Sequence, residues 1–205
     1  MANLICLAGL SNSGKSTSLR TLDPKTTFII SCTNKQLQIP GFRKKYPKVE
    51  VKEGKLVGNW LVSNNYSQIE KILHAVNKTR PDIKVIIIDD LNYLLSNETF
   101  ENAQVKGYEK FTILAKNYYD LITDCQLLND NLTVVVVSHI ENFGTDLDPQ
   151  YRLWTTGKML CNQINLDGMF SYIIYSERYI DDNDDEVHYR FKTRTDGNDT
   201  CRSVA

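Results

Sequence analysis

The stretch Gly9-Leu-Ser-Asn-Ser-Gly14-Lys15-Ser16 decides how the rest of the chain is interpreted. It matches the pattern G-x-x-x-x-G-K-[ST], a glycine-rich loop whose backbone N–H groups surround phosphates. The apolar run at residues 4–8 predicts a buried strand before the loop, and residues 15–22 predict a helix that ends before Asp23-Pro24. A strand, this loop and a helix in succession are the context in which the pattern predicts a phosphate site.

Each polar position of this loop has an expected role. Amide N–H groups from Asn12 to Lys15 should surround the β-phosphate at the positive end of the helix. Lys15 should reach the β- and γ-phosphate oxygens, Ser16 should place its hydroxyl on Mg²⁺, and Thr17 should lie near the α-phosphate. The residues expected to bind the nucleotide are Gly9, Asn12, Ser13, Gly14, Lys15, Ser16 and Thr17.

A second segment, Val85-Ile-Ile-Ile-Asp89-Asp90, places two carboxylates at the end of an apolar strand. Sites in open α/β sheets lie at the carboxyl ends of strands. We therefore expect Asp89, together with Ser16, to hold the Mg²⁺ shell, and Asp90 to orient or deprotonate an attacking water. As an alternative, either acid could cap the helix that follows the strand.

A third segment, at residues 134–137, predicts a strand that ends in Ser138-His139, with Glu141 beyond it. A polar side chain here could contact the γ-phosphate or the attacking water and report hydrolysis. Ser138 or His139 could instead only satisfy backbone groups. The candidate catalytic residues are Lys15, Asp90, Glu141 and His139.

The remaining patterns predict strands that alternate with helices. Strands are expected at residues 27–31, 84–89, 132–138, 169–176 and 187–193, helices from Asn65 and from about residue 105 to 128, and an acidic turn at 181–186. The expected fold is α/β, a three-layer sandwich with a mostly parallel sheet and an antiparallel C-terminal edge. No linker or repeat marks a boundary, so residues 1–205 are expected to form a single domain.

Composition narrows the class of protein. Lys+Arg is 24 and Asp+Glu is 25, a balance that argues against coating duplex DNA by charge alone. No apolar run has the length of a membrane span, and Met1-Ala2-Asn3 lacks the basic segment of a secretory signal, so we expect a cytoplasmic protein without membrane contact. The five cysteines are scattered without a C-x-x-C pair, which predicts buried thiols rather than disulfides or zinc.

A basic segment at residues 41–48 interleaves Arg43, Lys44 and Lys45 with aromatic residues, and Lys35 lies nearby. Cationic grooves with stacked rings hold single-stranded nucleic acid, whereas a solvated loop is the plainer alternative. Single-stranded DNA, contacted through Lys35, Arg43, Lys44 and Lys45, is the expected partner. Lys192 and Arg194 could reach a neighbouring subunit's nucleotide or could be ordinary surface charge.

With these motifs the chain resembles the phage-encoded RecA-like P-loop ATPases, often labelled AAA-type nucleotide-binding proteins. The resemblance rests on the long helix expected at about 105–128 and on residues 9–17, 27–30, 34–35, 40–46, 86–90, 135–141, 156–160 and 189–194. It implies a RecA-like core, ATP with Mg²⁺, homo-oligomeric rings or filaments, and a role in recombination by single-strand annealing in the host cytoplasm. RecA proteins place a glutamate base just after the second strand, whereas Ser31-Cys32-Thr33-Asn34 holds no acid. Hydrolysis would then use Asp90 or Glu141, or be slow.

The expected function is therefore Mg²⁺-dependent ATP hydrolysis coupled to single-stranded DNA binding in phage recombination or replication. One alternative is a nucleotide-gated binding module with little turnover. Another is a nucleoside or nucleotide kinase, although such kinases usually add an arginine-rich lid, and Arg43 is the only arginine between Arg20 and Arg80.

Overall fold

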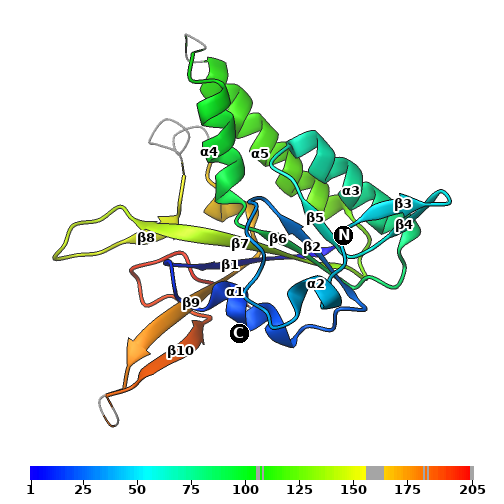
Figure 1. The fold of residues 1–205 in the computed structure, drawn as a ribbon. Helices are drawn as coiled ribbons and strands as arrows, with labels where there is room; N and C mark the ends of the chain where they lie inside the picture. Colours follow the sequence, from blue (N-terminus) through cyan, green and yellow to red (C-terminus); the bar gives the residue numbers. More distant parts are fainter. Residues whose placement is uncertain (105–106, 108, 156–163, 182, 184, 204–205) are drawn as a thin grey trace.

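Four strands with near-continuous apolar sequence form the centre of one mixed sheet in the computed structural model (Figure 1). They are β1 (Asn3–Gly9), β2 (Thr27–Ser31), β6 (Val85–Asp89) and β7 (Thr133–Asn142). The structure describes residues 1–104, 107, 109–155, 164–181, 183 and 185–203. Strands buried on both faces read as apolar runs because helices cover each side of a parallel sheet.

The strand order is β10-β9-β1-β7-β6-β2-β5, with β8 paired to β7. The added strands are β5 (Trp60–Val62), β8 (Tyr151–Leu153), β9 (Tyr172–Ile180) and β10 (Val187–Lys192). The pairs β9–β10 and β7–β8 are antiparallel, and the other pairs of the sheet are parallel. The chain is thus an α/β protein with a mostly parallel sheet and antiparallel edge strands, as the sequence predicts. A separate hairpin joins β3 (Glu50–Lys52) to β4 (Lys55–Val57).

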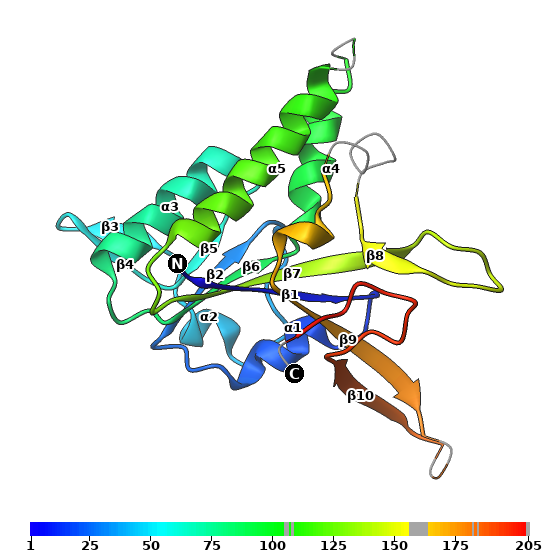
Figure 2. The same ribbon diagram turned by 180° about the vertical axis from the view of Figure 1, so that it is seen from behind.

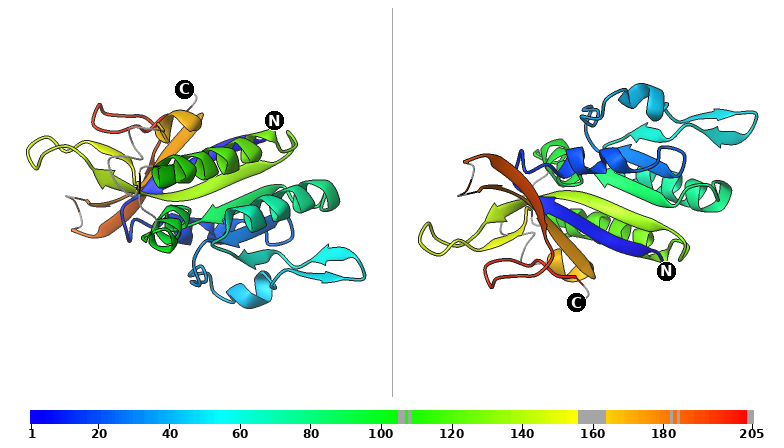
Figure 3. Two further views of the ribbon diagram at one scale, coloured as in Figure 1. Left: turned by 90° about the horizontal axis from the view of Figure 1, so that it is seen from above. Right: turned by 90° about the horizontal axis from the view of Figure 1, so that it is seen from below.

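Helices lie on both faces of the sheet (Figures 1 and 3). One face carries α3 (Tyr66–Thr79), α4 (Asn92–Glu101) and α5 (Glu109–Leu127), and the other carries α1 (Lys15–Ser18) and α2 (Phe42–Lys45). The alternation of side chains along β6 supplies both cores, because Ile86 and Ile88 join the cluster under α3 and α5 whereas Ile87 joins the cluster under α1 and α2.

Several local predictions are confirmed. The second strand has the predicted bounds, and Asn65 caps α3 by accepting a hydrogen bond from the Gln68 amide at 3.0 Å. The described cysteines are Cys6, Cys32, Cys125 and Cys201, and all four are free and buried. None of the helices in the described ranges has the length and hydrophobicity that crossing a bilayer requires.

Other expectations need correction. The helix expected at residues 15–22 is α-helical only over Lys15–Ser18 and continues as a 3₁₀ turn, η1 (Leu19–Thr21). The sequence predicts no bounds for α4, because the apolar pair Leu94 and Leu95 is followed by four polar residues at 96–99 and the apolar spacing does not continue. The fourth strand is predicted to end at Ser138, whereas β7 continues to Asn142 because β8 pairs with its extension. The segment at residues 156–160 lies outside the described residues.

Candidate functional site

The glycine-rich loop follows β1 and has a backbone that most side chains would not permit. Asn12 and Gly14 hold left-handed φ angles of 62° and 91°. A Cβ built on Gly9 would lie 2.5 Å from the Ser176 carbonyl oxygen of β9, so only glycine allows this approach. The loop therefore has the turn that the sequence pattern predicts, and it packs against the neighbouring strand.

The side chain of Lys15 folds back over the loop. Its Nζ donates hydrogen bonds to the carbonyl oxygens of Gly9 at 2.8 Å and Leu10 at 2.7 Å. Burial lowers the pKa of Lys15, against the charges of Asp90 and Asp89, which raise it. The ammonium group is thus held inside the loop by neutral acceptors, which a more strongly attracting anion can replace.

Asp89 is the last residue of β6, and it lies at the carboxyl end of that strand, in the same cavity as the loop. Its side chain is buried, and its Oδ1 has no hydrogen-bond partner among the described residues. Burial raises the pKa of Asp89 to about 7, the Asp90 charge adds to this, and Lys15 and the Ser16 hydroxyl oppose it. A buried carboxylate oxygen without a partner is costly to the fold, and such atoms often mark ligand or metal positions.

Asp90 has a left-handed φ of 59° and approaches His139, whose Nε2 lies 3.5 Å from its Oδ1. Burial alone would raise the pKa of Asp90, but contact with His139 and the charges of Lys35 and Lys15 lower it overall. Helix α4 is capped at Leu91 without any side-chain cap. Neither Asp89 nor Asp90 therefore caps the helix, which removes the alternative that the sequence left open.

These groups line one cavity of about 230 Å³, which we call the phosphate cavity. Its walls are residues 11–17, residues 35–38, Asp89, Asp90 and His139. It brings together every sequence-predicted nucleotide and metal residue except Gly9, whose carbonyl oxygen instead accepts from Lys15. Of the four candidate catalytic residues, it brings together Lys15, Asp90 and His139.

Glu141 lies outside this cavity. It sits on the extension of β7, in register with Arg152 of β8, and its Oε1 accepts a hydrogen bond from Arg152 Nε at 2.8 Å. The distance of Glu141 from the end of the predicted strand does not reveal that an antiparallel partner continues that strand. Glu141 therefore has a structural partner in place of the expected contact with a nucleotide.

Asn92 is a residue that the sequence analysis missed. It is 2% exposed, and its Oδ1 accepts hydrogen bonds from Ser138 Oγ at 3.0 Å and from the His139 amide at 2.7 Å. Its Nδ2 donates to the Trp154 carbonyl oxygen at 2.8 Å. Asn92 thus fixes the strand end that carries His139, and the Ser138 hydroxyl is used inside the fold. No sequence signal marks an asparagine whose partners lie so far along the chain.

The basic segment divides into two parts. Lys35 lines the phosphate cavity, with its Nζ 5.3 Å from the centre of the Tyr93 ring. Arg43, Lys44 and Lys45 are exposed on α2, whereas Phe42 and Tyr46, the rings expected to stack on bases, are buried in the core. The interleaved aromatic residues therefore anchor α2, and they are not available for stacking on single-stranded DNA.

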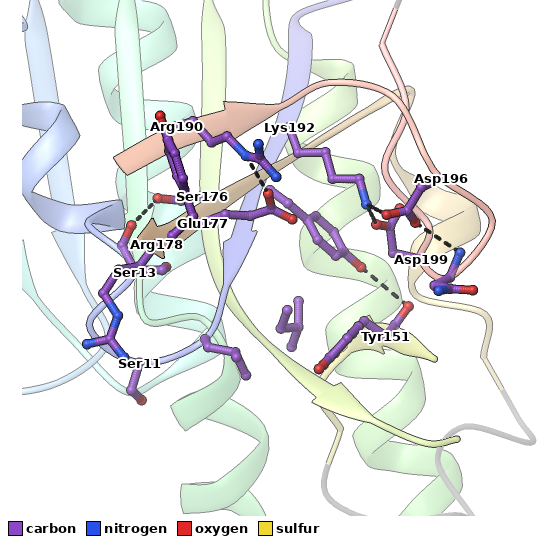
Figure 4. Close-up of a pocket in the computed structure, with 15 residues that line it drawn as sticks. Ser11, Ser13, Tyr151, Ser176, Glu177, Arg178, Arg190, Lys192, Asp196 and Asp199 are labelled. Carbon is purple, nitrogen blue, oxygen red and sulfur yellow. Dashed lines mark hydrogen bonds and ion pairs between the residues drawn. The ribbon is translucent and has the colours of Figure 1, made fainter. Parts of the chain in front are cut away.

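A second cavity of about 390 Å³, here the hairpin cavity, lies between the loop and the β9–β10 hairpin (Figure 4). Two of its cations, Arg190 and Lys192, already have carboxylate partners. Arg190 pairs with Glu177 at 3.0 Å, and Lys192 contacts Asp196 at 2.7 Å and Asp199 at 2.5 Å. Lys192 is therefore neither an ordinary surface charge nor a free cation that could reach a neighbouring subunit.

Comparison with known protein families identifies the family of the chain. A protein-family model described as Exotoxin A binding matches residues 30–200, which is most of the chain, and the matched segment begins after the glycine-rich loop. No curated protein matches the chain. The expected membership of the phage RecA-like ATPases is therefore wrong. It rested on short motifs, and a glycine-rich loop with a strand-end acid occurs in many unrelated families of one fold.

Proposed function

The chain belongs to the Exotoxin A binding family, and we propose that it binds ATP with Mg²⁺ in the phosphate cavity and hydrolyses it. One observation carries the proposal: Lys15 and the unpartnered buried Oδ1 of Asp89 line the same cavity as a G-x-x-x-x-G-K-S loop. A cation beside a glycine-rich turn suits phosphate oxygens, and a carboxylate oxygen without a partner suits a metal ion.

Triphosphate binding would use backbone and side chain together. The first amide groups of α1 have no acceptor within the helix, and they can donate to phosphate oxygens. Because α1 is only four residues long, its dipole adds little, and Lys15 has to supply most of the attraction. On binding, the Lys15 ammonium would replace its hydrogen bonds to the carbonyl oxygens of Gly9 and Leu10 with hydrogen bonds to phosphate oxygens. This exchange favours binding because a charged acceptor holds an ammonium group more strongly than a neutral one.

Ser16 and Asp89 are the residues that would hold Mg²⁺. Among the described residues there is no cluster of three or more His, Cys, Asp or Glu side chains that could bind a metal. Proteins bind Mg²⁺ through one or two carboxylates together with substrate phosphates, and Asp89 would supply such a carboxylate. When bound, the cation neutralises charge on the β- and γ-phosphates.

Hydrolysis would involve Asp90 and His139. In this step a water oxygen attacks the γ-phosphorus, the bond to the β–γ bridging oxygen breaks, and a water proton is released. Asp90, with a lowered pKa, stays ionised and can accept a hydrogen bond from that water. A carboxylate of low pKa is a weak base, so we expect slow turnover.

The position of the site in the sheet also supports this proposal. Strand β7 lies between β1 and β6, so the loop and Asp89 come from parallel strands whose carboxyl ends share one sheet edge. Ligands of open α/β sheets bind at that edge. A RecA-like P-loop core is the finer description of the fold that we propose on these grounds.

Phosphate release by the full chain tests the proposal. We expect slow, Mg²⁺-dependent release from ATP that disappears in Lys15→Ala and persists in Lys44→Ala, because Lys44 is exposed on α2 and lies outside the cavity. Equal release by the two variants would refute a role for the loop. Adding single-stranded DNA, nucleosides or nucleotides to the same assay tests for coupling to DNA and for transfer to an acceptor.

A further inference from the structure

The β9–β10 hairpin turns one of its faces toward the phosphate loop (Figures 1 and 2). On β9, Ser176 donates a hydrogen bond through Oγ to the carbonyl oxygen of Ser13 at 2.5 Å. Side chains two residues apart on a strand share a face, so Arg178 lies on this side as well. Tyr189 of β10 is the cross-strand neighbour of Arg178, and cross-strand neighbours share a face.

The ring of Tyr189 packs directly against the loop. A Cβ built on Gly14 would lie 3.1 Å from Cδ1 of Tyr189 and 3.6 Å from its Cε1. The side chain is nevertheless 60% exposed, so the ring touches the loop with one part and presents the rest to solvent. An exposed aromatic ring fixed beside a phosphate-binding turn is positioned to meet whatever is attached to the phosphates.

The opposite face of the hairpin is occupied by its own contacts. There, the Tyr179 ring centre lies 4.9 Å from the Arg190 guanidinium and 5.6 Å from the His188 ring centre. Arg190 is in turn paired with Glu177. On the loop-side face, by contrast, the described ranges show neither an ion pair nor a side-chain hydrogen bond for Arg178. The hairpin thus has one satisfied face and one face that is open beside the loop.

The sheet order decides on which side of the loop the nucleoside should lie. Asp89, and with it the metal and the γ-phosphate, belongs to β6, which lies on one side of β1, whereas the hairpin starts from β9 on the other side. A triphosphate held at Gly14 with its γ-phosphate toward Asp89 must therefore extend its nucleoside toward the hairpin. Tyr189 is the aromatic ring in contact with the loop on that side.

We propose that Tyr189 stacks on the base of the nucleotide and forms the base-side wall of the site. The inference rests on the proposed function, since it requires a triphosphate in the phosphate cavity. Every base has a π-face, so a stacking ring adds affinity for the nucleoside part without reading the identity of the base.

The test compares a whole nucleotide with its phosphate tail. Equilibrium titrations of the full chain with Mg²⁺ and ATP, and with Mg²⁺ and inorganic tripolyphosphate, are made on wild type, Tyr189→Ala, Tyr189→Phe and Tyr179→Ala. Tyr189→Ala should weaken ATP binding about 10-fold, the scale of one lost base–aromatic stack, and leave tripolyphosphate binding unchanged. Tyr189→Phe keeps the ring and should bind both ligands like wild type. Tyr179→Ala removes a tyrosine from the opposite face and should also leave both affinities unchanged.

Each other outcome has a defined meaning. If Tyr189→Ala weakens both ligands equally, the ring only supports the loop at Gly14, and the stacking role is overturned. If it weakens neither, the base lies elsewhere, while the proposed function stands because wild type binds both ligands. Failure of wild type to bind either ligand overturns the proposed function and the stacking role together.

Discussion

The phosphate cavity and the hairpin cavity share Ser11 and Ser13 of the loop but treat their charges differently. In the hairpin cavity, Lys192 and Arg190 are paired with carboxylates of the chain itself. In the phosphate cavity, within the part of the chain that the structure describes, Lys15 donates hydrogen bonds to neutral carbonyl oxygens alone, and one oxygen of Asp89 has no partner.

This contrast in charge pairing indicates that the phosphate cavity is the one suited to a ligand. Charges that are paired within a fold need no ligand to neutralise them, whereas buried polar atoms without partners cost free energy unless a ligand satisfies them. The hairpin cavity is the larger, at about 390 Å³ against 230 Å³, so volume alone would point to the wrong place. We therefore expect changes in the phosphate cavity to alter ligand binding, and changes in the hairpin cavity to alter stability.

The largest expected effect is a difference in affinity for Mg²⁺–ATP between variants of Lys15 and variants of Lys192. Lys15→Ala should weaken Mg²⁺–ATP binding about 1000-fold, because two charge-assisted hydrogen bonds to phosphate oxygens are lost. Lys192→Ala should leave that affinity unchanged, since its Nζ is held by Asp196 and Asp199. Isothermal titration calorimetry measures both. A loss of affinity in Lys192→Ala as large as that in Lys15→Ala would erase the distinction between the cavities.

The next largest expected effect is on stability. Here Lys192→Ala should lower the free energy of unfolding more than Lys15→Ala does. Burial would lower the pKa of Lys192, but hydrogen bonds with Asp196 and Asp199 raise it overall. Lys192→Ala leaves the carboxylate of Asp199, whose side chain is 3% exposed, without its cation. The free energy of unfolding should fall by about 3 kcal/mol, as when one partner of a buried pair is removed. Urea unfolding of ligand-free protein tests this, and a fall of similar size in Lys15→Ala would contradict the comparison.

A smaller expected effect is an increase in the free energy of unfolding, produced by a substitution at Asp89. Burial raises the pKa of Asp89 to about 7, so this group destabilises the ligand-free chain fully above that pH. The cost shrinks as the pH falls below 7 and is gone only below the ordinary pKa of an aspartate. At pH 8 without Mg²⁺, Asp89→Asn should raise the free energy of unfolding by about 1 kcal/mol. The same variant should lose the Mg²⁺ dependence of ATP binding. Thermal unfolding scans that show no gain in stability would mean that Asp89 is not held at a cost for a ligand.

Part of this arrangement could be predicted from sequence because it is local. The loop pattern, the cap at Asn65 and the acid that ends β6 each depend on residues that are close together in the chain. The partners of Asn92 lie 46, 47 and 62 residues away, so only the folded chain reveals its role. The burial of Phe42 and Tyr46 likewise depends on the sheet beneath α2. The family of the chain could not be predicted either, because short motifs do not specify it.

Glu141 illustrates this limit and gives the smallest predicted effect. Its distance from the end of the expected strand suggested a catalytic base, but pairing of β8 with β7 directs it to Arg152. Glu141→Gln keeps the shape of the side chain and should leave the rate of phosphate release within about twofold of wild type, because the side chain it changes lies outside the phosphate cavity. Steady-state phosphate release measures this. A loss of most of the activity would return Glu141 to the catalytic residues.

Hydrogen exchange measured with and without Mg²⁺–ATP tests directly which of the two cavities the nucleotide occupies. We predict that the ligand slows exchange at residues 11–17 and around Asp89 and Asp90, with no change around Lys192 and Asp199. Slower exchange confined to Lys192 and Asp199, or no change anywhere in the chain, would contradict the assignment of the phosphate cavity.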